Sequence, residues 1–231
     1  MTAAARGGRG MGVDRCPSYI KTMEFNGFRL FPGAIDAVAQ SALVDEVLAA
    51  ASVAPFYRPM TPSGKPMSVE QTSLGAYGWT TDRGGYRYEP LHPLTRQPWP
   101  AMPQSLLALW ARYAGDETPP DSCLVNLYRQ GAKMGLHTDS DEEDLTAPVL
   151  SVSLGDTAVF RLGGPARGDP SRTVRLNSGD VSLLAGPSRR FFHGVDRILA
   201  GSSRLVPGGG RINLTLRRAK RQAAAVSRVG P

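Results

Sequence analysis

The feature that most constrains the fold of this chain is an alternation of apolar and polar residues, which recurs in short segments from about residue 121 to residue 217. A period of two puts successive side chains on opposite faces of an extended strand, so this half of the chain predicts short β-strands. Turn-forming residues separate them, and Gly155-Asp156 predicts a hairpin. The predicted strands cover residues 124–128, 149–154, 158–162, 173–176, 181–185 and 211–217. Strands at such intervals are typical of a β-sandwich or a jelly roll.

The first half of the chain has a different pattern. Residues 36–51 are rich in Ala and predict a helix, and residues 104–114 predict a second, shorter helix. The apolar face of the first helix would consist of Val38, Leu43, Val47 and Leu48. Residues 59–99 are rich in Pro, Gly and Thr and hold most of the aromatic residues, which is too irregular for a core helix and too aromatic for a linker. We therefore expect an α+β protein with helices packed outside a β-rich core.

Charge and composition narrow the class of protein. The net charge is +7, and 23 of the 27 basic residues are Arg, whose guanidinium donates paired hydrogen bonds to phosphate, so a polyanionic partner is favoured. The sequence contains no apolar run of about 18 residues, so no transmembrane helix is expected. The first residues lack the apolar stretch of a secretory signal. Cys16 and Cys123 are too few for a disulfide framework and are expected to be reduced thiols of a cytoplasmic protein. Residues 1–24 are expected to form a disordered basic tail.

Three residues suggest a metal site. His137 and Asp139 are two apart, so their side chains leave an extended chain on the same face, and His193 follows 56 residues after His137. Two imidazoles and one carboxylate are the facial triad that binds non-haem Fe(II) and leaves positions open for other ligands. The His-x-Asp pattern alone is weak, because a single His in a β protein is more often a structural residue than a ligand.

The last predicted strand, residues 211–217, has two distinct faces. Ile212, Leu214 and Leu216 would pack in a core, and Asn213 and Thr215 would share the opposite face with an Arg at each end. These two arginines either meet solvent or enclose an anion. A dicarboxylate cosubstrate needs such an anchor, because a buried carboxylate without a partner is costly.

Together these motifs resemble the signature set of the AlkB family of dioxygenases. The resemblance runs from about residue 25 to 218 and lies in Met67-Ser68-Val69, Gly78-Trp79-Thr80-Thr81, residues 98–105, Asn126-Leu127-Tyr128, His137-Thr138-Asp139-Ser140-Asp141, Ala147-Pro148, residues 151–155, His193 and residues 211–217. It implies a double-stranded β-helix, or jelly-roll, core with N-terminal helices and a nucleotide-recognition lid. Residues 25–218 would be a single domain, with the lid at about 55–100 and the core at about 121–218, followed by a basic tail at 219–231. The protein is expected to be a monomer.

The resemblance also implies the cofactors and their ligands. His137, Asp139 and His193 match the catalytic Fe(II) ligands, and 2-oxoglutarate and O2 would be the cosubstrates. The 2-oxoglutarate site would consist of Asn126, Leu127, Tyr128, Arg211, Ile212, Asn213, Leu214, Thr215, Leu216 and Arg217, with Arg217 nearer the metal. The reaction implied is conversion of 2-oxoglutarate to succinate and CO2, with hydroxylation of an N-methyl group that is then lost as formaldehyde.

The implied substrate is 1-methyladenine or 3-methylcytosine in single- or double-stranded DNA, and the sequence does not distinguish DNA from RNA as the physiological target. Its contacts would come from Trp79, Tyr86, Arg87, Tyr88, Asp141 and Arg167. A base must leave the stack to reach a metal centre, and Trp79 would supply one wall of its aromatic slot. The alternatives stay open at this point: Trp79 as a core indole and Asp141 as an exposed loop acid.

Three departures from the family pattern concern the lid and its surroundings. Residues 202–210 are rich in Gly and look flexible, Arg161 adds a charge to a strand, and Asp82 places an acid beside the lid. Two other functions remain possible from the sequence. One is a dioxygenase that acts on a small molecule or a protein side chain, and the other is a catalytically silent jelly-roll binding module.

Overall fold

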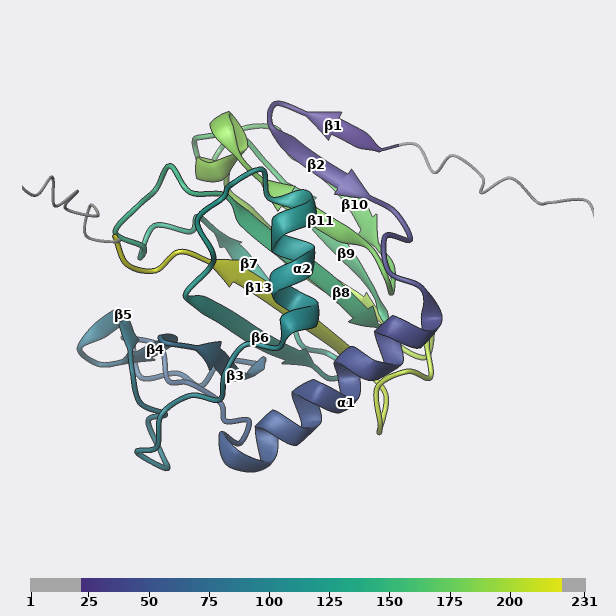
Figure 1. The fold of residues 1–231 in the computed structure, drawn as a ribbon. Coiled ribbons are helices and arrows are strands. Elements are labelled where there is room, and N and C mark those ends of the chain that lie inside the picture. Colours follow the sequence, from purple (N-terminus) through teal and green to yellow (C-terminus); the bar gives the residue numbers. More distant parts are fainter. Residues whose placement is uncertain (1–21, 222–231) are drawn as a thin grey trace, which may run out of the picture.

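The computed structural model describes residues 22–221, whose core is a pair of antiparallel β-sheets packed face to face (Figure 1). The larger sheet has the strand order β1-β2-β11-β8-β13-β6-β3 and the smaller has the order β10-β9-β12-β7. The larger sheet consists of β1 (Met23–Phe25), β2 (Phe28–Phe31), β3 (Glu70–Gly75), β6 (Ser122–Tyr128), β8 (Val149–Gly155), β11 (Val181–Leu184) and β13 (Arg211–Arg217). The smaller consists of β7 (Met134–His137), β9 (Thr157–Leu162), β10 (Arg172–Leu176) and β12 (His193–Leu199). The predicted jelly-roll core is confirmed.

One of the predicted turns passes the chain from the larger sheet to the smaller one. Residues 155–156 join β8 in the larger sheet to β9 in the smaller, so the predicted hairpin is wrong. The buried Asp156 carboxylate accepts backbone N–H groups from Gly201, Ser203 and Gly210, which fixes this corner against the loop before β13. These contacts also hold residues 202–210, where the sequence suggested flexibility.

Both helices cover the outer face of the larger sheet (Figure 1). Helix α1 (Ala37–Val53) begins at Asp36, whose side chain accepts the Ala39 N–H at 2.8 Å, and α2 (Gln104–Tyr113) buries Leu106 and Trp110. The buried residues of α1 are Leu43, Val44 and Val47. The predicted face of this helix is therefore partly wrong, because Val38 is 81% exposed in the first turn and Leu48 is 37% exposed.

Strand β13 lies inside the larger sheet between β6 and β8. Ile212, Leu214 and Leu216 are completely buried in the core cluster that also contains the helix residues, as the alternation predicts. Arg211 is paired in register with Tyr128, and Asn213 with Asn126. Since paired residues share a face, these polar side chains form one surface directed at the smaller sheet.

The aromatic segment before α2 is more regular than its composition suggests. It contains β3 at the edge of the larger sheet and a separate hairpin of β4 (Gly78–Asp82) and β5 (Gly85–Glu89). Its one histidine, His92, is completely buried, accepts the N–H groups of Leu94 and Thr95 at Nδ1 and donates from Nε2 to the Pro55 carbonyl. His92 is therefore a structural residue of this segment.

The two predicted tails lie mostly outside the described residues, as does Cys16. At the first boundary, β1 begins at Met23, inside the predicted tail. At the other, the Asp121 carboxylate accepts the backbone N–H groups of Ala219 and Lys220 at 2.6 and 3.0 Å, so the fold extends past residue 218. Cys123 is a buried thiol without a disulfide, and burial raises its pKa to about 12. Among residues 22–221 no helix has the length and apolar character needed to cross a membrane.

Candidate metal centre and substrate groove

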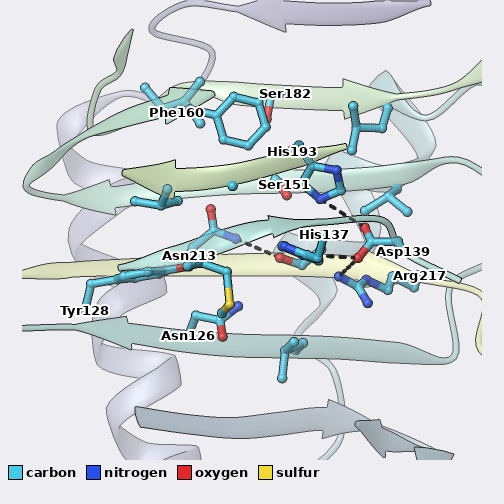
Figure 2. A pocket seen from close by; sticks show the side chains of 18 residues that line it. Asn126, Tyr128, His137, Asp139, Ser151, Phe160, Ser182, His193, Asn213 and Arg217 are labelled. Atoms are coloured by element: carbon cyan, nitrogen blue, oxygen red, sulfur yellow. Dashed lines mark hydrogen bonds and ion pairs between the residues drawn. The ribbon is translucent and has the colours of Figure 1, made fainter. Parts of the chain in front are cut away.

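His137, Asp139 and His193 meet at the open end of the space between the two sheets (Figure 2). His137 ends β7 and His193 begins β12, and the two residues are direct partners in the ladder of the smaller sheet. One potential ligand atom from each of the three residues lies within 4.8 Å of the others. Gly194 allows this approach, because a Cβ there would lie 2.6 Å from the Met134 carbonyl oxygen of β7. The sheet register thus brings His193 next to the His137–Asp139 pair, although it follows His137 by 56 residues in the sequence.

Both imidazoles have their orientation fixed by the backbone. Nδ1 of His137 lies 2.9 Å from the Gly135 carbonyl oxygen, and Nδ1 of His193 lies 2.9 Å from that of Phe191. A carbonyl only accepts, so each Nδ1 is the donor and each Nε2 keeps its lone pair. Those Nε2 atoms lie 3.8 and 3.6 Å from the two carboxylate oxygens of Asp139. Burial lowers the pKa of His193 to about 4, which keeps this imidazole neutral and able to bind a metal.

Asp139 is buried beside a cation. Arg217 donates from Nη2 to its Oδ1 at 2.9 Å (Figure 2). Burial alone would raise the pKa of Asp139, but the Arg217 guanidinium, with smaller contributions from His193 and His137, holds it below its usual range. The carboxylate is therefore ionised, which a metal ligand requires.

Behind Asp139 lies a charged network that the sequence analysis did not identify. The buried Glu142 accepts from Arg217 Nη1 at 3.0 Å, from the Tyr88 hydroxyl at 2.7 Å and from Arg189 Nη2 at 3.0 Å. Arg189 also donates from Nη1 to the Asp139 carbonyl oxygen at 2.6 Å, which ties the segment before His193 to the loop that bears Asp139. In the sequence, Glu142 belongs to an acidic run that looks like an exposed loop, and no local signal distinguishes it from its neighbours.

An inner cavity extends from the triad between the sheets. Asn126, Tyr128 and Asn213 line it (Figure 2). Thr215 lines it as well, and all four belong to the predicted 2-oxoglutarate set. Four other members of that set, Leu127, Ile212, Leu214 and Leu216, point their side chains into the opposite, helix-covered core. These four residues belong to strands that border the cavity, but their side chains do not face it.

Arg211 adjoins this cavity and has no carboxylate partner in the described part of the chain. It is completely buried and donates from Nη2 to Ser153 Oγ and to Asn213 Oδ1, both at 2.9 Å, while its Nε has no partner. Burial lowers its pKa to about 10, and the opposing effect of Tyr128 and Asp180 is smaller. A buried cation without a counter-ion favours an anionic ligand, so the cavity fits a carboxylate at this end.

An outer groove of about 510 Å³ opens onto the other side of the triad. This volume is within the range of about 300–1,000 Å³ that is usual for small-ligand sites. Trp79 and Tyr86 stack with ring centroids 5.4 Å apart at its wall, and Trp79 donates from Nε1 to Asp141 Oδ2 at 2.8 Å. Arg167 also lines the groove, with its guanidinium 5.0 Å from the centre of the Phe192 ring. Trp79 is 9% exposed, so it is both packed and part of the groove wall.

Two predicted substrate residues do not line this groove. Tyr88 is buried, and its hydroxyl lies in the network of Glu142 and Arg217. Arg87 is exposed and makes a two-pronged ion pair with Asp82 at 2.6 and 2.9 Å. Asp82 is therefore neutralised within the β4–β5 hairpin, and Arg161 is neutralised in the same way by Asp196 at 2.8 Å.

Comparison with known proteins supports this geometry. Residues 27–217 match the model of the 2OG-Fe(II) oxygenase superfamily. A protein of Caulobacter vibrioides named as an alpha-ketoglutarate-dependent dioxygenase AlkB homolog is 64% identical over 194 residues, which are 84% of this chain and 88% of that protein. The Escherichia coli alpha-ketoglutarate-dependent dioxygenase AlkB is 46% identical over 185 residues, 78% of this chain and 85% of that protein.

Two further similarities concern a eukaryotic branch. An Arabidopsis thaliana protein named as the DNA N(6)-methyladenine demethylase ALKBH1A is 44% identical over 87 residues, 38% of this chain and 25% of that protein. The solved structure of OsALKBH1 superposes with a TM-score of 0.71 at 30% identity and covers 86% of this chain and 100% of that one. The match to the 2OG-Fe(II) oxygenase model and to these relatives places the chain among proteins named for dioxygenase or demethylase activity.

Proposed function

The chain belongs to the 2OG-Fe(II) oxygenase superfamily as an AlkB homologue, and on this premise we propose that it repairs alkylated bases of nucleic acids by oxidative demethylation. It is an Fe(II)- and 2-oxoglutarate-dependent dioxygenase. When bound, iron together with 2-oxoglutarate and O2 supplies the oxidation of the alkyl carbon. The protein residues would bind the iron and the cosubstrate, orient the base and exclude water.

His137, Asp139 and His193 would hold the iron. The donor set fits, because it consists of two imidazoles with free Nε2 atoms and one ionised carboxylate. Arg217 and Glu142 would keep the carboxylate in place, since Arg217 bridges Asp139 and Glu142. Such partners of a metal ligand fix its orientation.

Arg211 would hold the far carboxylate of 2-oxoglutarate. Its buried charge lacks a counter-ion among the described residues. It borders the cavity through its hydrogen bond to Asn213, and Asn126, Tyr128 and Asn213 offer polar groups inside the cavity. Burial raises the pKa of the Tyr128 hydroxyl to about 12, so this group stays protonated and can donate to the carboxylate. The apolar residues of the smaller sheet, such as Phe160 and Val195, would exclude water from the rest of the cavity.

The alkylated base would enter the outer groove between the metal site and the Trp79–Tyr86 pair. Stacked aromatic rings favour the flat face of an extruded base, and the Asp141 carboxylate favours a base with positive charge. 1-Methyladenine and 3-methylcytosine carry such a charge. Arg167 at the edge of the groove would contact a phosphate.

One observation carries this proposal: the inner cavity and the outer groove meet at the triad. His137, Asp139 and Arg217 line both spaces, so a cosubstrate bound between the sheets and a base bound under the aromatic pair would meet at the metal. Activity on a small molecule or a protein side chain is not favoured, because the relatives that match most of this chain are AlkB proteins.

The test is mass spectrometry of a panel of methylated oligonucleotides after incubation with iron, ascorbate and 2-oxoglutarate. The panel carries 1-methyladenine or 3-methylcytosine in single-stranded DNA, double-stranded DNA and RNA. We expect loss of the methyl group with release of succinate, and no loss with the His193→Ala variant. Succinate release that no member of the panel stimulates, without loss of methyl groups, would contradict the proposal and support another substrate.

A further inference from the structure

The segment just before His193 divides its side chains between the interior and the surface. Arg189 and Phe191 are buried, with Arg189 in the network of Glu142 and Phe191 in the core between the sheets. Arg190 is exposed, and Phe192 is half-buried with one side in the outer groove. In each of these two pairs of identical neighbours, one side chain is buried and the other faces outward. The metal site does not account for the outward residues, Arg190 and Phe192.

These outward residues line a second groove, of about 370 Å³, next to the substrate groove. The two grooves share Phe192 as well as the segment 138–140 that bears Asp139. The second groove also contains Arg190 and the apolar side chains of Leu145 and Pro165. It is therefore a continuation of the substrate groove past the Phe192 ring.

The polar groups of the second groove match a phosphodiester. Within residues 22–221, Arg190 has no ion pair or hydrogen bond, and the hydroxyls of Thr138 and Ser140 have no hydrogen-bond partner. Arg167 lies over Phe192 in the substrate groove, so each groove has one arginine. A row of guanidiniums with an aromatic ring between them is typical of surfaces that follow a single strand of nucleic acid.

We propose that this second groove binds the nucleotide next to the lesion in the same strand. Arg190 and the hydroxyls of Thr138 and Ser140 would bind its phosphate, and Phe192, Leu145 and Pro165 would contact its sugar and base. This inference rests on the proposed function and extends it: the enzyme distinguishes a lesion within a strand from a free methylated nucleotide.

The experiment compares two substrates that carry the same lesion. One is 1-methyladenosine monophosphate, and the other is a trinucleotide with 1-methyladenosine in the middle. For the wild type we expect a higher kcat/KM with the trinucleotide. Arg190→Gln should lower the ratio of the two values by about threefold, the scale of one exposed charge contact. It should also reduce the slope of log affinity against log salt by about 0.7 for the trinucleotide, which is one phosphate contact on a single strand.

Two further variants separate this role from effects on folding. Arg190→Lys keeps the charge and should restore the salt slope. Arg204→Gln removes an exposed arginine from the loop before β13, at the far end of that strand from Arg217, and should leave the ratio and the slope unchanged.

The outcomes are distinct. A ratio and a slope for Arg190→Gln equal to those of the wild type would overturn the second groove while leaving demethylation intact. Equal losses in Arg190→Gln and Arg204→Gln would also overturn it, because they would show a general charge effect. Failure of the wild type to demethylate either substrate would instead refute the proposed function.

Discussion

The two arginines at the ends of β13 have the same side chain, the same face and nearly the same burial, but opposite surroundings. Arg217 is hydrogen-bonded to the carboxylates of Asp139 and Glu142 at 2.9 and 3.0 Å. Arg211 contacts only neutral groups, Ser153 and Asn213 among them. Burial lowers the pKa of Arg211 to about 10, whereas for Arg217 the carboxylates of Asp139 and Glu142 overcome the effect of burial and raise the pKa.

The difference separates a structural cation from a ligand-binding one. A buried charge is costly unless an opposite charge lies beside it, and at Arg217 the protein supplies that charge. At Arg211 it does not, and under the proposed function the far carboxylate of 2-oxoglutarate would supply it. The strand register alone makes the two positions equivalent, and only their partners give them different roles.

The largest expected effect is at the metal end of the strand. Replacing His193 by Ala removes one of three proposed ligands, and since loss of a partner behind a ligand already costs about 10–100-fold in metal affinity, loss of the ligand should exceed 100-fold. Iron binding measured by equilibrium dialysis and demethylation measured by mass spectrometry should both fall below detection. Near-normal turnover of the variant would show that the triad is wrong and that Arg217 does not lie at a metal site.

The next effect tests Arg217 as a structural cation. Arg217→Met leaves the Asp139 and Glu142 carboxylates buried without their guanidinium, and removal of one partner from a buried ion pair costs about 3–5 kcal/mol. The free energy of unfolding, measured by urea denaturation without iron or 2-oxoglutarate, should fall by that amount. The matched variant Arg211→Met should change it little, because the charge that it removes has no counter-ion. If both variants lost the same free energy of unfolding, the distinction between Arg217 as a structural cation and Arg211 as a ligand-binding one would be wrong.

A smaller effect tests Arg211 as the cosubstrate anchor. A hydrogen bond to a charged group is worth about 1.5–3 kcal/mol, so Arg211→Met should raise the KM for 2-oxoglutarate on the order of 10- to 100-fold. Iron affinity should be unaffected, and the rise in melting temperature that 2-oxoglutarate gives to the wild type should disappear. An unchanged KM would mean that the buried charge of Arg211 serves only the fold.

The His137–Asp139 pair and the faces of β13 were predictable because their patterns are local. His137 and Asp139 are two residues apart, and the alternation in residues 211–217 directly predicts which side chains share a face. His193 completes the triad by residue type alone, and the family resemblance supports that choice. Assignment of the triad as iron ligands stays a prediction, and the structure places the three residues within reach of one ion.

Other features depend on partners that the sequence does not specify. A period of two identifies strands such as β8 and β9 but not their neighbours in the sheets, so a short turn between them looked like a hairpin. Glu142 looked exposed because its burial depends on Tyr88 from β5 and Arg189 from the segment before β12, which are distant in sequence. The buried network was therefore not predictable from local patterns.

The contrast between charges with and without protein partners extends to the groove, where Asp141 gives the smallest expected effect. Asp141 is exposed and accepts only from the Trp79 indole, at 2.8 Å, within the described structure. It either holds Trp79 in position or also attracts a cationic base. Replacing Asp141 by Asn removes the charge but keeps an oxygen that accepts from the indole.

If the charge selects the base, Asp141→Asn should lower kcat/KM for 1-methyladenine and 3-methylcytosine by about fivefold, the upper end for an exposed charge pair, and should change the neutral lesion 1-methylguanine less. If Asp141 only positions Trp79, the Asn variant should match the wild type on all three lesions, and Asp141→Ala should lower all three alike. Steady-state kinetics of both variants on oligonucleotides with one lesion each separates these outcomes. A uniform loss would place Asp141 with Arg217, as a charge that serves the protein, and a loss confined to the cationic bases would place it with Arg211, as a charge that awaits its ligand.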